Sequence, residues 1–66
     1  MDRAVRLARL RQIIETRKIG SQEMLLQILH AEGFAITQAT LSRDLKLLKV
    51  GRVPDGKAGY LYTFSE

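Results

Sequence analysis

Residues 36–45 read ITQATLSRDL, and this stretch decides the fold. Thr37 is expected to cap a helix running from Gln38 to about Lys49, because a threonine hydroxyl can accept a backbone N–H of the first helical turn. Leucines follow at spacings i, i+4 and i+7 and predict one buried edge; they are Leu41, Leu45 and Leu48. Small or polar side chains occupy the rest of the circumference. The segment therefore predicts a helix with one face for a core and one for a partner.

A second helix is predicted immediately upstream. Ser21 is a suitable N-cap, and Gly33 lies where a left-handed residue would end the helix, followed by the apolar Phe34. Apolar side chains cover more than half of the circumference, which predicts a helix sandwiched between neighbours. These side chains are Met24, Leu25, Leu26, Ile28, Leu29 and Ala31.

A first helix is predicted over residues 3–17, which contain neither glycine nor proline and are followed by Ile19-Gly20. Its apolar side chains fall within an arc of roughly 120° and predict a stripe that faces the core; they are Leu7, Leu10, Ile13 and Ile14. The arginines of the first turns have two open interpretations, contact with a phosphate backbone or simple solvation. They are Arg3, Arg6 and Arg9.

After Val50 the apolar period changes from helical to alternating. Residues 50–53 predict a short strand, residues 54–59 a six-residue loop with turn chemistry, and residues 60–64 a returning strand. A lone hairpin is marginal in water, so it is expected to pack on the helices. The face shared by Tyr60, Tyr62 and Phe64 is expected to make that contact. The alternative is a stacking platform for single-stranded nucleic acid.

Three helices and a two-stranded antiparallel hairpin define the expected fold class, mainly α with a small β-hairpin. With a helix-turn-helix in the middle, this order is the winged helix-turn-helix. Residues 1–66 are expected to form one domain, since the sequence has no linker, repeat or low-complexity segment.

The composition of the chain limits the classes of ligand that it is expected to bind. The chain has no cysteine, a formal net charge of +4 and a calculated isoelectric point near 10.0. Residues 1–20 carry +4 and residues 38–60 carry +3, on either side of −2 in residues 21–37. No apolar stretch is long enough for a membrane span or a signal peptide. We therefore expect a basic, cytoplasmic protein with no membrane partner and with a polyanion as its ligand.

The third helix has the side chains that reading DNA requires. Gln38 can bond adenine in two places and Arg43 can do the same with guanine, both in the major groove. Ser42 and the neighbouring threonines can donate to phosphate or base, and the helix N-terminus favours an anion. The expected DNA-binding residues are Thr37, Gln38, Thr40, Ser42, Arg43, Lys46 and, in the loop of the hairpin, Lys57.

Catalysis and metal binding have no support in the sequence. His30 is the only histidine and lacks a cluster of further ligands, and Ser42 has no histidine placed to activate it. The protein is therefore expected not to be an enzyme. The alternative function is a winged helix that binds another protein through its third helix, for which Leu47 would be the apolar anchor. Asp44 has two open roles, orienting Arg43 or pairing with an arginine of the first helix.

The segment ITQATLSRDL resembles the recognition segment of the bacterial arginine repressor family. The resemblance extends over nearly the whole chain, and its matching positions are Arg11 to Ile14, Gly20 to Glu23, Leu25, Leu29, Lys49, Val50 and Gly59 to Tyr62. It implies the DNA-binding domain of a transcriptional regulator, a repressor of arginine biosynthesis and catabolism. Its third helix would enter the major groove of operator DNA, and its wing would meet the backbone or the minor groove. The family pattern implies operator contacts for Gln38, Ser42 and Arg43.

The resemblance also implies properties of a longer protein. Members of the family have a C-terminal domain that forms oligomers, hexamers in the family, and binds L-arginine as co-repressor. The present chain is accordingly expected to be a fragment that itself holds no cofactor. Whether the fragment is monomeric or self-associates is left open by the sequence.

Overall fold

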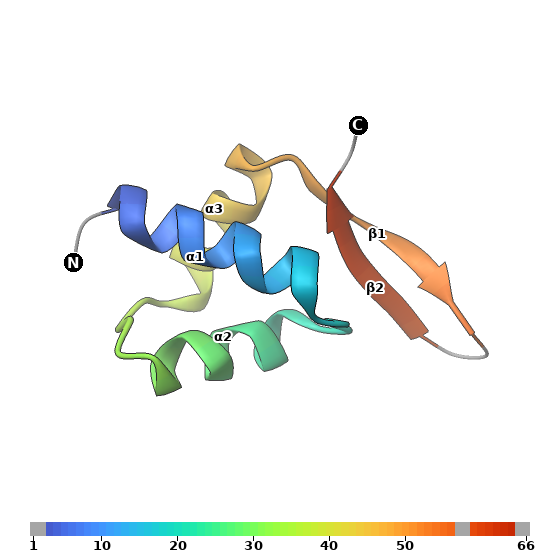
Figure 1. Ribbon diagram of the computed structural model, residues 1–66, viewed down its shortest axis with the longest axis horizontal. Helices are drawn as coiled ribbons and strands as arrows, with labels where there is room; N and C mark the ends of the chain where they lie inside the picture. The colour runs from blue at the N-terminus through green and yellow to red at the C-terminus, as the bar shows by residue number, and fades with distance from the viewer. Residues whose placement is uncertain (1–2, 57–58, 65–66) are drawn as a thin grey trace.

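The computed structural model describes residues 3–56 and 59–64. Its helices are α1 (Arg3–Thr16), α2 (Gln22–Ala31) and α3 (Gln38–Leu47), and its strands are β1 (Val50–Asp55) and β2 (Gly59–Phe64). The three helices gather in one body, and the hairpin projects away from it (Figure 1). The predicted order of three helices and an antiparallel wing is confirmed.

The core forms where the three helices meet, and each helix contributes its predicted apolar edge. Buried apolar side chains come from all three helices and from both connections, and they are Leu10, Ile13, Ile14, Ile19, Leu25, Leu29, Phe34, Leu41 and Leu45. The prediction that α2 is covered on most sides is wrong for Met24, which is 43% exposed. The fully buried side chains of α2 are Leu25 and Leu29, so α2 buries one edge rather than most of its circumference.

Local chemistry sets the boundaries of α2, as the sequence predicts. The Ser21 hydroxyl accepts the Met24 N–H at 3.1 Å. At the other end Gly33 has a φ of 93°, and its N–H donates to the His30 carbonyl at 3.0 Å. The Phe34 N–H reaches the Leu29 carbonyl at 2.9 Å. This pair of bonds is a Schellman motif, and the buried Phe34 ring provides the apolar contact that accompanies it.

The third helix ends earlier than predicted. Its last residue is Leu47 and its C-cap is Leu48, whereas the sequence predicted an end near Lys49. Lys49 has a φ of 59°, in the left-handed region, and its N–H donates to the Lys46 carbonyl at 3.1 Å. A left-handed residue cannot continue a right-handed helix, so Lys49 ends α3 and turns the chain into the wing.

The strands of the wing are longer than predicted, so the prediction of a six-residue loop over residues 54–59 is wrong. Pro54 pairs with Tyr60 and Asp55 with Gly59, which leaves residues 56–58 as the connection. Both strands of a two-stranded sheet are edge strands, so a proline without an N–H is tolerated in β1.

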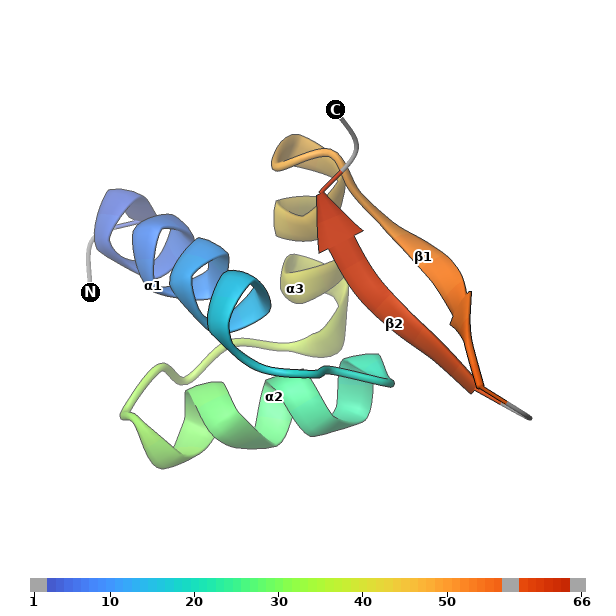
Figure 2. The same cartoon turned by 45° about the vertical axis from the view of Figure 1, so that its right-hand side comes forward.

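The base of the wing packs on the helical body, while most described side chains farther along β1 and β2 are exposed. Tyr62 and Phe64 pack against the core, and the Tyr62 N–H donates to the Ile19 carbonyl at 2.9 Å. Tyr60 is 53% exposed, so the prediction that it packs on the helices is wrong. Tyr60 is the second residue of β2, at the end of the strand away from Phe64, and the free end of the hairpin extends away from the helical body (Figure 2). The Arg52 guanidinium carbon lies 5.5 Å from the centre of the Tyr60 ring.

Candidate nucleic-acid interface

The buried edge of α3 is formed by Leu41, Asp44 and Leu45, which turns the other sides of the helix outward. Thr37, Gln38, Arg43 and Lys46 are exposed, and Thr40 and Ser42 are partly buried; these are six of the seven predicted DNA-binding residues. The seventh, Lys57, lies outside the described residues.

Two cations of α3 are free to meet a ligand. Within residues 3–56 and 59–64, the side chains of Arg43 and Lys46 form no hydrogen bond or ion pair. Both side chains are exposed. Their charges are therefore not neutralised by the protein itself.

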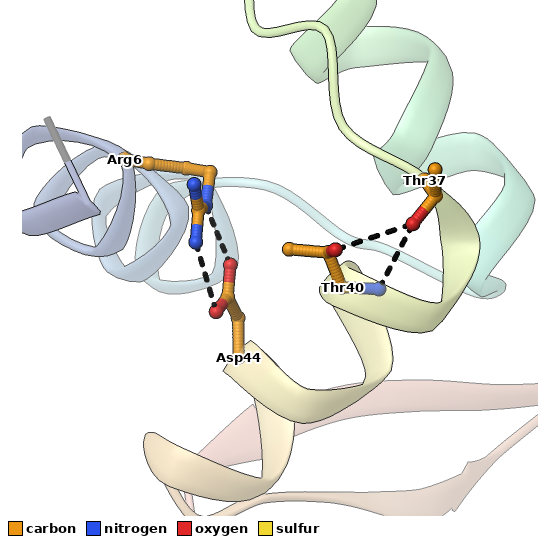
Figure 3. A network of polar contacts seen from close by, with 4 residues as sticks. All are labelled: Arg6, Thr37, Thr40 and Asp44. Atoms are coloured by element: carbon orange, nitrogen blue, oxygen red, sulfur yellow. Dashed lines mark hydrogen bonds and ion pairs between the residues drawn. The ribbon is translucent and has the colours of Figure 1, made fainter. Parts of the chain in front are cut away.

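Thr37 and Thr40 form the start of α3 together. The Thr37 hydroxyl oxygen accepts the Thr40 N–H at 3.2 Å and donates its own proton to the Thr40 hydroxyl at 3.2 Å (Figure 3). Accepting the Thr40 N–H gives Thr37 its capping role, while the Thr40 hydroxyl keeps a proton that it can donate outward.

Asp44 pairs with Arg6 of α1, which is one of the two roles left open by the sequence. Arg6 Nε donates to one carboxylate oxygen at 2.6 Å and Nη2 to the other at 3.2 Å (Figure 3). The Asp44 side chain is 4% exposed and the Arg6 side chain 14%. The hydrogen bond to the carboxylate is the main cause that raises the pKa of Arg6. Because Asp44 faces α1, its negative charge is kept off the outward side of α3.

A second arginine of α1 is also engaged within the protein. Arg9 Nε and Nη2 donate to the two carboxylate oxygens of Glu32, each at 2.6 Å. This hydrogen bonding lowers the pKa of Glu32 and raises that of Arg9. Of the three arginines considered for phosphate contact, Arg6 and Arg9 therefore hold α1 against other parts of the protein.

Sequence reasoning missed Gln22, the first residue of α2. The Ser42 hydroxyl donates to Gln22 Oε1 at 3.0 Å. Gln22, Ser42, Lys46 and Arg52 line a hollow of about 390 Å³ between α2, α3 and the wing. No local pattern could indicate this contact, because Gln22 and Ser42 are 20 residues apart and meet only when the two helices cross.

The described residues give no support to a metal site or a membrane span. Residues 3–56 and 59–64 hold no group of three or more side chains able to ligate a metal ion. His30 Nε2 lies 2.8 Å from the Ile36 carbonyl oxygen. In the same part of the chain, no helix has both the length and the apolar character needed to cross a membrane.

The sequence of this chain matches a known protein family. The family described as "Arginine repressor, DNA binding domain" matches residues 1–66. The chain belongs to this family. The resemblance to the arginine repressor family is thereby confirmed, and this family is one of DNA-binding domains rather than of enzymes, as expected.

Curated arginine repressors show the same relationship. The arginine repressor of Bacteroides thetaiotaomicron is 52% identical over 60 residues, which cover 91% of this chain and 38% of that protein. The arginine repressor of Parabacteroides distasonis is 54% identical over 54 residues, covering 82% and 37%. That of Symbiobacterium thermophilum is 42% identical over 66 residues, covering 100% and 44%. The arginine repressor domain described above thus spans about two fifths of the length of these relatives.

Proposed function

We propose that the chain binds double-stranded operator DNA in a sequence-specific way. In this proposal α3 lies in the major groove, and the wing meets the backbone or the minor groove. The observation that carries it is the division of α3 into two faces. Leu41, Asp44 and Leu45 are buried, while Gln38 and Arg43 are exposed.

The outward side chains suit two kinds of contact. Gln38 would bond the N6 and N7 atoms of adenine, and Arg43 the O6 and N7 atoms of guanine. Lys46 would contact phosphate, as would Thr40 through its free proton and Lys57 of the wing. The start of α3 adds its free N–H groups and the positive end of the helix dipole.

The proposal extends to a complete regulator, of which this chain would be the DNA-binding domain. It would repress genes of arginine biosynthesis and control those of arginine catabolism in the cytoplasm. It would act as a homo-oligomer, a hexamer by family resemblance, with L-arginine as co-repressor. No residue of the present chain is assigned to L-arginine.

Binding of a partner protein through α3 has weaker support. A protein partner would need apolar anchors on the exposed side of the helix. Among the described residues of α3, Leu47 is the exposed large apolar side chain, at 54%. A single apolar anchor on the same helix as the unpaired side chains of Arg43 and Lys46 suits binding to a polyanion better than binding in a groove of another protein.

The test is a titration with two duplexes at two salt concentrations. A duplex selected from a randomised library, with two half-sites about one helical turn apart, is compared with its scrambled sequence. The chain is expected to bind the selected duplex more tightly, and both affinities are expected to fall as salt rises. Equal binding to both duplexes would reject sequence-specific recognition. Paired half-sites are used because one such domain buries only about 600–1,000 Å² on DNA.

A further inference from the structure

We infer that Gln22 is a positioning residue for base recognition, because it fixes the hydrogen-bonding direction of the Ser42 hydroxyl. This inference rests on the proposed function. Its observation is the bond in which Ser42 Oγ donates to Gln22 Oε1 at 3.0 Å. Gln22 is the first residue of α2, and Ser42 lies on α3, so the bond joins the two helices of the helix-turn-helix motif.

A serine hydroxyl has one proton and two acceptor lone pairs. Once the proton is directed to Gln22, Ser42 can only accept from a ligand. A free serine could instead rotate and either donate or accept. The bond to Gln22 therefore converts an ambiguous side chain into one with a single chemical preference.

Such an acceptor distinguishes between bases. In the major groove, cytosine and adenine present an exocyclic amino group, N4 or N6, whereas guanine O6 and thymine O4 are acceptors. Ser42 held by Gln22 would thus favour cytosine or adenine at the position it faces. Two acceptors facing each other would leave both without a partner, which is unfavourable in a desolvated interface.

The surroundings of Ser42 and Gln22 are consistent with a role of this pair in base recognition. Ser42 and Gln22 are both partly buried, and they lie in the hollow that Lys46 and Arg52 also line. The two cations supply attraction for phosphate that is independent of sequence. The pair between them supplies a neutral acceptor that can depend on the base.

The experiment selects bound duplexes from a randomised library and compares base preferences position by position. Four single variants are compared with the parent: S42A, Q22M, Q22E and Q27M. S42A identifies the position that Ser42 reads. Gln27 is an exposed glutamine of the same helix, so Q27M is the matched control for the glutamine-to-methionine change. Thermal unfolding of each variant verifies that it is folded.

The position identified by S42A is expected to favour cytosine or adenine by about fivefold or more in the parent. Q22M is expected to reduce that preference to less than about twofold, and Q27M to leave it unchanged. Glutamate offers only acceptor oxygens, so Q22E still takes the Ser42 proton. Q22E is therefore expected to keep the preference while weakening binding to all duplexes, since it adds a negative charge.

Three outcomes overturn the inference. They are an unchanged preference in Q22M, a guanine or thymine preference at the Ser42 position, and a loss in Q22M confined to a position that S42A leaves intact. The last would mean that Gln22 contacts a base directly. A parent that enriches no sequence would instead reject the proposed function itself, and the two failures are therefore distinguishable.

Discussion

Asp44 follows Arg43 in the sequence, yet its carboxylate faces away from the exposed side of α3 and holds Arg6 of α1 through Nε at 2.6 Å and Nη2 at 3.2 Å. The two oxygens and two nitrogens form the parallel arrangement that suits a guanidinium and a carboxylate. The bond joins residues 38 positions apart and fixes the rotation of α3 about its own axis relative to α1. That rotation determines which side chains of α3 face outward.

Removing this carboxylate should destabilise the fold. Asp44→Ala leaves Arg6 partly buried without its partner, and we expect a loss of about 2–4 kcal/mol in the free energy of unfolding, measured by urea denaturation. Asp55→Ala, at an exposed position of the wing, is the control and should change stability by less than about 0.5 kcal/mol. Equal stability of the two variants would contradict the structural role of the pair. An apolar replacement of both partners, Arg6→Met with Asp44→Leu, should recover most of the loss.

Arg43 and Lys46 should differ in how their loss affects DNA binding. Arg43→Ala should weaken binding to a selected duplex by about 1–3 kcal/mol and relax the preference at one base position. Lys46→Ala should weaken all duplexes about equally and lower the slope of log affinity against log salt by about 1. Titrations at several salt concentrations measure both effects. Arg11→Ala removes one charge from α1 and should do neither; if all three variants bind like the parent, the placement of α3 on DNA is wrong.

The ion pair of Arg9 and Glu32 should make stability depend on acid. The hydrogen bonds from Arg9 lower the pKa of Glu32 below its ordinary 4.5 in the folded protein. The stabilisation is therefore fully present above pH 4.5 and is lost as the pH falls through the lowered value. The melting temperature of Glu32→Gln should lie below that of the parent at pH 7, and the difference should vanish at low pH. Glu15→Gln removes a weaker exposed pair, at 3.6 Å, and should show almost no such difference. A Glu32→Gln difference that grows towards low pH would contradict this sign.

Lys49 holds a backbone conformation that suits glycine better. Its φ of 59° places a side chain in the left-handed region, where a Cβ atom is unfavourable. Lys49→Gly should raise the free energy of unfolding by about 0.5 kcal/mol, because the relief of this strain exceeds the greater freedom of glycine in the unfolded chain. The opposite change at a similar cap, Gly33→Ala at a φ of 93°, should destabilise by about 1 kcal/mol. Urea midpoints with unchanged slopes would measure both, and a less stable Lys49→Gly would refute the assignment of strain.

The parts of the fold that depend on neighbouring residues could be predicted from the sequence. The caps at Ser21 and Thr37 and the stop at Gly33 each involve residues within a few positions of each other. The leucine edge of α3 follows from helical geometry alone. The early termination of α3 could not be predicted, because a lysine does not by itself indicate a left-handed backbone conformation at position 49.

The contacts that define the site were less predictable, since they depend on how helices cross. Two roles for Asp44 were chemically reasonable, and only the position of α1 selects Arg6. Tyr60 belongs to the same alternating face as Tyr62, yet Tyr62 packs against the core and Tyr60 is 53% exposed, a difference that depends on how the hairpin sits on the helices. The bond from Ser42 to Gln22 likewise arises from tertiary structure.

The bond from the Tyr62 N–H to the Ile19 carbonyl, at 2.9 Å, has a consequence for how the domain meets a duplex. It holds the C-terminal half of β2 against the corner between α1 and α2, so we expect the base of the wing and the helical body to move as one unit. In the proposed complex, little conformational entropy would be lost at this joint on binding. The loss would fall mainly on long exposed side chains such as Arg43 and Lys46. Loss of this bond would leave the proposed DNA-contacting residues of α3 in place and still weaken binding, since the wing would have to be ordered at each encounter.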